Sequence, residues 1–266
     1  MSDKDKPRVL LEYYLKRLRL PTMLREYEPM AKVCTEDRSD YTTYLLRLVE
    51  REVLDREKRA AERRIKEAKF PVIKTIDTFD FKAQPSINEQ LVRELLRGEY
   101  LSKRENVLLV GNPGPGKTHL ACAIAFAACA QGKKVRFHTA TALVTMLIES
   151  RDERYLSRLQ KQLHRLDLLV LDELGYVPFS KIGAELLFEV VSQAYEHHSL
   201  MVTSNLPFEK WVETFGSERL TGALLDRLTR CCHILEANEE SYRLRQAKNA
   251  PNANRKLSIT KAPRFS

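Results

Sequence analysis

Apolar residues recur at helical spacing in the first part of this chain. Near the start they repeat at intervals of three and four, which predicts a helix carrying Leu10, Leu11, Tyr14, Leu15 and Leu18. Pro21 then permits a second helix to begin at its first turn. Residues 40–69 predict a third and longer helix. We therefore expect a small domain made only of helices.

The third predicted helix changes character along its length. Its first half has an apolar face made of Tyr44, Leu45, Leu48 and Val49. Its second half is rich in charge, and its basic members are Arg56, Lys58, Arg59, Arg63, Arg64 and Lys66. Such a run is typical of a solvated face held by ion pairs four residues apart. Contact with nucleic-acid phosphates is the alternative interpretation.

The pattern after Pro71 is different, because short apolar runs alternate with helical stretches. Five runs predict strands, at residues 106–111, 134–140, 166–173, 199–205 and 231–237. Strands separated by helices indicate a parallel sheet with right-handed crossovers. We predict an α/β fold, in which a five-stranded parallel sheet lies between helices. The expected divisions are 1–70 (helical domain), 71–85 (linker packing on the core), 86–247 (sheet domain) and 248–266 (flexible tail).

The charge of the chain is positive and uneven. The 266 residues carry a formal net charge of +9, and residues 241–266 contain seven Lys or Arg and no acid. A basic protein with a basic tail favours an anionic polymer such as nucleic acid as partner. A role of the charge in solubility alone is the alternative.

Cysteine usage and apolar run lengths bear on the compartment. The five cysteines show no metal-ligand spacing, and an odd number favours a reduced, cytoplasmic location. Of these, Cys122 and Cys129 are expected in the core. The longest apolar run, residues 120–130, is too short to span a bilayer, and no signal peptide is evident. We expect no membrane partner.

A Gly- and Pro-rich segment joins the first predicted strand to an alanine-rich helix. It reads GNPGPGKT and fits G-x-x-x-x-G-K-[ST]. Glycines let backbone amides approach a polyphosphate, and the helix start directs its unpaired N–H groups at the same anion. Lys117 would contact the β- and γ-phosphates, and the Thr118 hydroxyl would bind Mg²⁺. The residues expected to contact the nucleotide are Gly111, Asn112, Pro113, Gly114, Pro115, Gly116, Lys117 and Thr118.

Polar residues end two later strands, where open α/β sheets bind ligands. Asp172 is expected to hold Mg²⁺, and Glu173 to act as general base on the attacking water, a role contributing about 10²–10⁴-fold. Asn205 is expected to touch the γ-phosphate or orient the water. The alternatives are a solvated strand end for the two acids and a turn-forming role for Asn205.

Four of these segments together resemble AAA+ ATPases of the DnaA/DnaC branch. They are GNPGPGKTHLA, LLVLDELGYVP, TSNLPFEKW and LLDRLTRCCHIL. Within that branch the chain is most similar to the IstB family, ATP-dependent helpers of the transposase IstA in bacterial insertion sequences. That likeness is carried by LRLPTMLREYEPMA, by the spacing of Glu50 and Arg56, and by AKFPVIKTIDTFDF. It covers nearly the whole chain.

The resemblance implies an AAA+ fold, ATP and Mg²⁺ as cofactors, and further residue roles. Asn205 becomes the sensor-1 residue, and Arg227 becomes an arginine finger that reaches into a neighbouring subunit. Arg243 falls near the position of a second sensor. The implied catalytic set is Lys117, Glu173, Asn205 and Arg227. A plain surface ion pair is the alternative for Arg227.

The function implied is that of an ATPase that forms a homo-oligomer on double-stranded DNA, with ATP between subunits, and controls an IstA-type transposase. One rival is a DnaC-like helicase loader, and another is an ATP-binding scaffold without hydrolysis. DNA contacts are expected from two basic stretches: Arg59, Arg63 and Arg64 in the third helix, and Arg151, Arg154 and Arg158 between the second and third strands. A solvated face paired with Asp152 and Glu153 is the alternative for the second stretch.

Overall fold

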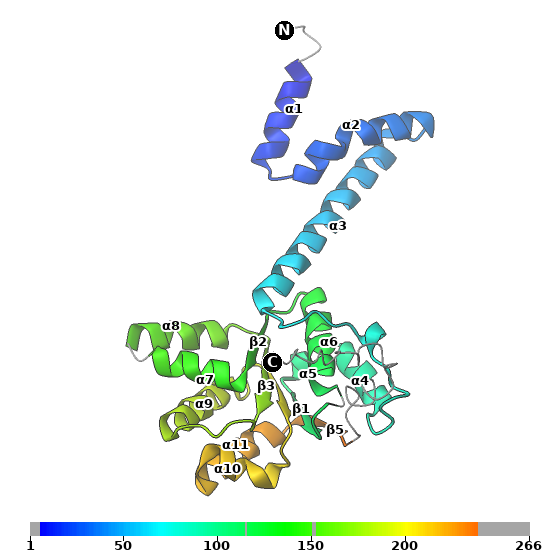
Figure 1. Ribbon diagram of the computed structural model, residues 1–266. Coiled ribbons are helices and arrows are strands. Elements are labelled where there is room, and N and C mark those ends of the chain that lie inside the picture. Colours follow the sequence, from blue (N-terminus) through cyan, green and yellow to red (C-terminus); the bar gives the residue numbers. More distant parts are fainter. Residues whose placement is uncertain (1–5, 115, 151–152, 239–266) are drawn as a thin grey trace, which may run out of the picture. The chain divides into compact units, whose positions relative to one another are not determined.

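The computed structural model describes residues 6–114, 116–150 and 153–238, with only the backbone of residues 153 and 154 (Figure 1). By its internal contacts the chain divides into two compact units, residues 1–66 and 67–266. Each unit is described separately. The division at residues 70, 85 and 247 stays a prediction, and the basic tail lies outside the described residues.

The N-terminal unit is made of the three predicted helices. They are α1 (Lys6–Arg17), α2 (Pro21–Glu36) and α3 (Tyr41–Ala68), the last of which continues into the second unit. The predicted helix start at Pro21 is confirmed. The carboxylate of Glu52 on α3 is buried and accepts hydrogen bonds from the backbone N–H groups of Thr22 (2.8 Å) and Met23 (3.0 Å). A carboxylate thus satisfies the unpaired donors at the start of α2.

The apolar stripes of this unit are buried only in part. Leu15 and Leu48 are buried as the helical spacing suggests. The other apolar residues of the first stripe are 43–65% exposed, and Leu45 and Val49 are 53% and 41% exposed. Periodicity therefore gave the helices correctly but overstated the core, because three helices cannot enclose every apolar position.

The second unit carries all the strands of the described chain in one sheet. The strands are β1 (Asn106–Gly111), β2 (Val135–Thr139), β3 (Leu168–Leu174), β4 (Ser199–Ser204) and β5 (Cys232–Ala237). All pairings are parallel, in the order β2-β3-β4-β1-β5, which confirms the predicted sheet. Before β1 the chain forms η1 (Ile76–Thr78), α4 (Glu89–Leu96) and α5 (Glu99–Lys103). The segments between strands contain α6 (Lys117–Ala130), α7 (Ala140–Glu149), α8 (Glu153–His164), α9 (Lys181–Ala194), η2 (Phe208–Lys210), α10 (Trp211–Phe215) and α11 (Glu218–Thr229).

Strand order decides which face each helix covers. Right-handed crossovers send α6 to one face of the sheet, and α7, α8, α9 and α11 to the other. Figure 1 shows α4 and α6 on one side and α7, α8 and α9 on the opposite side. The helices of the second face share one apolar core that includes Trp211 and Phe215. The indole N–H of Trp211 donates to the Leu206 carbonyl (3.2 Å), which satisfies its polar atom.

The burial of the cysteines agrees with the sequence analysis. All five cysteines are free, and Cys122 and Cys129 are buried as expected. In the part of the chain that the structure describes, no helix has both the length and the apolar character needed to cross a membrane. The same residues contain no group of three or more His, Cys, Asp or Glu side chains that could hold a metal ion.

Candidate nucleotide-binding site

The carboxyl ends of β1, β3 and β4 meet at one edge of the sheet, beside a cavity of about 670 Å³. Parallel strands bring residues that are far apart in sequence to this edge. Eight of the predicted site residues line the cavity: Pro113, Gly114, Gly116, Lys117, Thr118, Asp172, Glu173 and Asn205. Gly111 and Asn112 precede them on the same loop, and Pro115 lies outside the described residues.

The loop between β1 and α6 depends on glycine at two close approaches. Gly111 has φ +140°, and a Cβ there would lie 2.2 Å from the carbonyl oxygen of Ala237 on β5. Gly116 has φ +106°, and a Cβ there would lie 2.7 Å from the ring of Phe79. Neither position accepts a side chain without displacement of a neighbour. The start of α6, with its unpaired N–H groups, follows at Lys117.

Lys117 is folded against its own loop. Its side chain is buried, and Nζ donates hydrogen bonds to the carbonyl oxygens of Gly111 (2.7 Å) and Asn112 (2.5 Å). Burial lowers the pKa of Lys117 to about 8, although the nearby Asp172 carboxylate opposes the shift. The ammonium is therefore close to its titration range before any phosphate is bound.

This shift makes ATP binding depend on pH. Above about pH 8 the free protein holds Lys117 increasingly neutral, and a bound triphosphate restores the proton because it favours the charged form. We expect ATP affinity to fall as the pH rises through 8 to 9, and binding near pH 8.5 to take up a proton, roughly one at most. Calorimetry in buffers of different ionisation enthalpy measures that uptake. Lys117→Arg, which stays charged, is the control. Binding without proton uptake by the unmodified protein would contradict the shift.

Thr118 and Asp172 come together although 54 residues separate them. The Thr118 hydroxyl donates to Asp172 Oδ1 (3.0 Å), and the hydroxyl of Thr203 donates to the same oxygen (2.5 Å). Asp172 is buried, and its carboxylate belongs to β3. A hydroxyl and a carboxylate are oxygen ligands of the type that Mg²⁺ prefers, so these two residues fit a magnesium site beside the phosphate loop.

Thr203 is a site residue to which the sequence analysis gave no role. Besides its bond to Asp172, its Oγ1 accepts a hydrogen bond from the backbone N–H of Glu173 (3.0 Å). One side chain on β4 therefore holds both acids of β3. Its only signal in the sequence is a polar position two residues before Asn205.

Glu173 has an unusual backbone. Its φ is +60°, in the left-handed region, and the pairing of β3 with β4 shifts register between Leu171 and Leu174. A bulge of this kind redirects a side chain, and a non-glycine residue in this region carries strain of about 1–3 kcal/mol. The side chain of Glu173 is exposed at the cavity, whereas Asp172 beside it is buried. The two acids thus have different environments.

The segment 71–84 supplies a wall of the cavity, which the sequence analysis described only as a packing linker. Phe79, Thr78 and Gln84 line it together with His119 of α6. The His119 ring is 3.1 Å from the carbonyl oxygen of Thr75 and 3.2 Å from Thr78 Oγ1. Burial lowers the pKa of His119 below its ordinary value. His119, which follows Lys117 and Thr118, therefore links the segment 71–84 to the phosphate loop.

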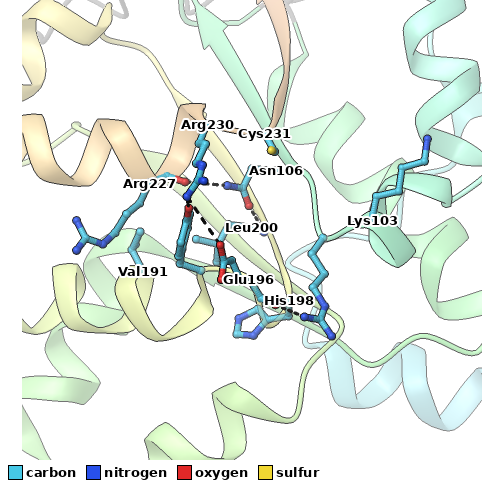
Figure 2. Close-up of a pocket in the computed structure, with 11 residues that line it drawn as sticks. Lys103, Asn106, Val191, Glu196, His198, Leu200, Arg227, Arg230 and Cys231 are labelled. Carbon is cyan, nitrogen blue, oxygen red and sulfur yellow. Dashed lines mark hydrogen bonds and ion pairs between the residues drawn. The ribbon is translucent and has the colours of Figure 1, made fainter.

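Arg227 does not lie at this cavity. It is on α11, where its guanidinium stacks over the Phe188 ring (4.7 Å) and donates to the Ala223 carbonyl (2.9 Å). It borders a second cavity of about 370 Å³ at the amino ends of β1 and β4, beside Asn106 and Leu200. Figure 2 shows the Arg227 guanidinium pointing away from Asn106 and Leu200. Among the described residues Arg227 forms no ion pair, which does not support the alternative of a surface salt bridge.

The two basic stretches differ in their surroundings. Leu156, Leu159 and Leu163 of α8 pack on the core, while Arg158 and Lys161 of α8 and Arg165, which follows the helix, are exposed. Arg151 and Asp152, and the side chains of Glu153 and Arg154, lie outside the described residues. On α3, Arg59 pairs with Glu52 (3.6 Å) and Asp55 (3.4 Å), and Arg56 pairs with Glu52 (3.3 Å). Arg63 is exposed and Arg64 is half-buried.

This fold and phosphate loop define an ATP-binding protein of the P-loop AAA+ class. The family model of the IstB-like ATP binding protein matches residues 13–250. The chain therefore belongs to the IstB-like family, and the resemblance seen in its sequence motifs is confirmed.

Two relatives cover almost the full length. One, named as an ATP-binding protein of insertion sequence IS5376 from Geobacillus stearothermophilus, is 40% identical over 88% of this chain and 93% of its own. Another, named as an ATP-binding protein of insertion sequence IS21 from Pseudomonas aeruginosa, is 36% identical over 90% and 91%.

Solved structures support the fold. AMPPCP-bound DnaA from Aquifex aeolicus superposes with a TM-score of 0.55 at 19% identity, covering 68% of this chain and 55% of that chain. DnaI gives a TM-score of 0.51 at 16% identity, covering 61% and 90%.

Proposed function

We propose that this protein is an ATP-dependent regulator of DNA transposition that oligomerises on duplex DNA and activates or directs an IstA-type transposase. The observation that carries the proposal is the distance in the fold between Arg227 and the nucleotide cavity. Lys117, Asp172 and Glu173 gather at the carboxyl edge of the sheet, whereas Arg227 borders the amino edge. The cation would therefore reach ATP only in a neighbouring subunit. We also propose a cytoplasmic location, because the five cysteines of the protein are free, as is usual in a reducing compartment.

The residues of the cavity suggest how hydrolysis proceeds. The loop amides and Lys117 bind the phosphates, and Thr118 with Asp172 would hold Mg²⁺, which would neutralise charge on the phosphate oxygens. Glu173 accepts a proton from the attacking water, and Asn205 orients that water or the γ-phosphate. A neighbour's Arg227 stabilises the charge of the transition state, so hydrolysis requires assembly. ATP at the subunit interface stabilises the oligomer, and hydrolysis of this ATP allows the subunits to dissociate.

The partners are proposed from the charge of the protein and from its similarity to named relatives. The net charge of +9 and the exposed basic side of α8 favour a phosphate backbone. The relatives are named for insertion sequences, which favours a transposase over a replicative helicase. Co-purification with a replicative helicase instead of a transposase would favour the loader alternative.

Phosphate release in the presence of DNA tests the function. We expect the rate per subunit to rise with duplex DNA and with protein concentration, and ATP to promote an assembly visible by sedimentation. Lys117→Ala is the control, and it should lose both effects because the triphosphate loses the cation of its loop. ATP binding without hydrolysis would establish the scaffold alternative. Hydrolysis independent of DNA and of concentration would contradict the proposal.

The exposed side of α8 gives a prediction about DNA affinity. Replacing Arg158 and Lys161 with alanine should weaken binding to all duplex sequences alike, and lower the salt dependence by about two counterions. The control replaces Lys103 and Lys210 with alanine, since both are exposed elsewhere on the protein. It removes the same charge and should weaken DNA binding less.

Removal of residues 248–266 should also have a smaller effect than the α8 substitutions. Filter binding over a range of salt concentrations measures all three variants. Normal binding by the α8 variant, with loss of binding after removal of the tail, would assign the contact to the tail instead.

A further inference from the structure

A buried carboxamide without a partner lies at the wall of the nucleotide cavity. Gln84 is 2% exposed, and it belongs to the lining of the cavity. Within the described part of the chain, neither Oε1 nor Nε2 of Gln84 has a hydrogen-bond partner. Buried polar groups in folded proteins are almost always paired, because an unpaired one is destabilising. The unpaired carboxamide therefore indicates that a ligand supplies its missing hydrogen bonds.

The backbone holds Gln84 in place. Its N–H donates to the Phe81 carbonyl (3.1 Å), and its own carbonyl accepts from the Ile87 N–H (3.1 Å). The terminal torsion of a glutamine is broad, so the carboxamide can turn toward a ligand without a backbone change. The backbone at Gln84 is thus held by two hydrogen bonds, and rotation of the carboxamide needs no change in it.

The position of Gln84 in the chain assigns it to the base end of the cavity. The phosphate end is defined by the loop before α6 and by Asp172, which faces Thr118. The remaining wall comes largely from residues 71–84, which contribute the apolar Val72 and Phe79 and the polar Lys74, Thr78 and Asp80 besides Gln84. A nucleotide base requires apolar surface for its faces and a small number of polar groups for its edge, and this wall offers both. The ring of Phe79 also adjoins Gly116, so this wall continues directly from the phosphate loop.

We propose that Gln84 determines the preference for adenine by binding the polar edge of the base. Oε1 accepts a hydrogen bond from the 6-amino group, and Nε2 donates one to the adjacent ring nitrogen. A carboxamide offers one acceptor beside one donor, which matches that edge of adenine in a bidentate arrangement. The inference rests on the binding of ATP, but not on hydrolysis, DNA or the transposase.

A cycle of two nucleotides and two proteins tests this contact. Purine riboside triphosphate lacks the 6-amino group and keeps the ring nitrogens and phosphates. We expect the unmodified protein to bind it about tenfold more weakly than ATP, because one buried acceptor loses its partner. In Gln84→Met the ratio of the two affinities should fall close to one. Equilibrium titration with Mg²⁺ and without DNA gives all four constants.

Two more variants separate base recognition from a structural role. Gln84→Glu keeps the size of the side chain but replaces the donor by a second acceptor, so it should bind ATP more weakly than the unmodified protein does. Gln90→Met changes an exposed glutamine outside the cavity and should leave the tenfold ratio intact.

An unchanged ratio in Gln84→Met would overturn the assignment, whether or not that variant binds more weakly overall. Equal binding of both nucleotides by the unmodified protein would overturn it as well. Failure of the proposed function would be recognised separately, as absence of DNA-stimulated hydrolysis in a protein that still distinguishes the two nucleotides.

Discussion

Replacement of Arg227 by alanine is expected to lower DNA-stimulated hydrolysis by about 10³–10⁵-fold, while a single subunit still binds ATP. The reason is that Arg227 borders the amino edge of the sheet and takes no part in the cavity of its own subunit. Its loss removes positive charge from the transition state in the neighbour, whose own cavity has no arginine among its described lining residues. Rates of phosphate release and ATP titrations measure the two effects.

The matched control for this variant is Arg219→Ala, which removes an exposed arginine near the start of the same helix, α11. Because Arg227 also stacks on Phe188, thermal unfolding of both variants must be compared. Turnover that falls equally in the two variants would indicate a general charge effect.

Mixing of two inactive variants tests whether Arg227 acts between subunits. Glu173→Gln subunits still carry Arg227, and Arg227→Ala subunits still carry Glu173. Where the two meet in the right order, one complete site forms, so partial turnover should return. Absence of turnover at every ratio, in mixtures shown to assemble together, would place the finger at another residue.

Replacement of Glu173 by glutamine should slow hydrolysis by about 10²–10⁴-fold without loss of ATP binding. Glutamine keeps the size of the side chain, so the left-handed backbone and its hydrogen bond to Thr203 can persist. The variant lacks only the carboxylate that acts as general base, whereas Asp172 and Thr118 remain to hold Mg²⁺. We also expect DNA assemblies of longer lifetime, because their release depends on hydrolysis.

The control for this second variant is Glu209→Gln, an exposed acid outside the nucleotide cavity. Single-turnover phosphate release, together with dissociation of the protein from labelled duplex DNA, measures the outcome. Turnover near that of the unmodified protein would show that another group takes the proton.

Local patterns along the chain predicted most of the elements of this fold. The apolar runs at 106–111 and 199–205 gave β1 and β4 to within one residue, because a strand covered on both faces has few polar positions. The phosphate loop was equally visible, since glycine is required where the backbone adopts positive φ beside Phe79 and Ala237. Such information lies in neighbouring residues and needs no knowledge of the rest of the chain.

Burial and the partners of each side chain were decided by tertiary structure. Leu10 and Leu45 follow a helical stripe and are still exposed, because burial depends on which elements pack against the stripe. Thr203 reaches both acids only because β3 and β4 are neighbours in the sheet.

The sequence by itself thus determined the helices, the strands and the residues of the phosphate loop, whose conformations depend on short-range sterics and periodicity. The tertiary structure decided the left-handed Glu173, the unpaired carboxamide of Gln84 and the separation of Arg227 from the nucleotide cavity. The physical reason is that these features arise from strand order and from contacts between residues distant in the chain, which no local pattern encodes.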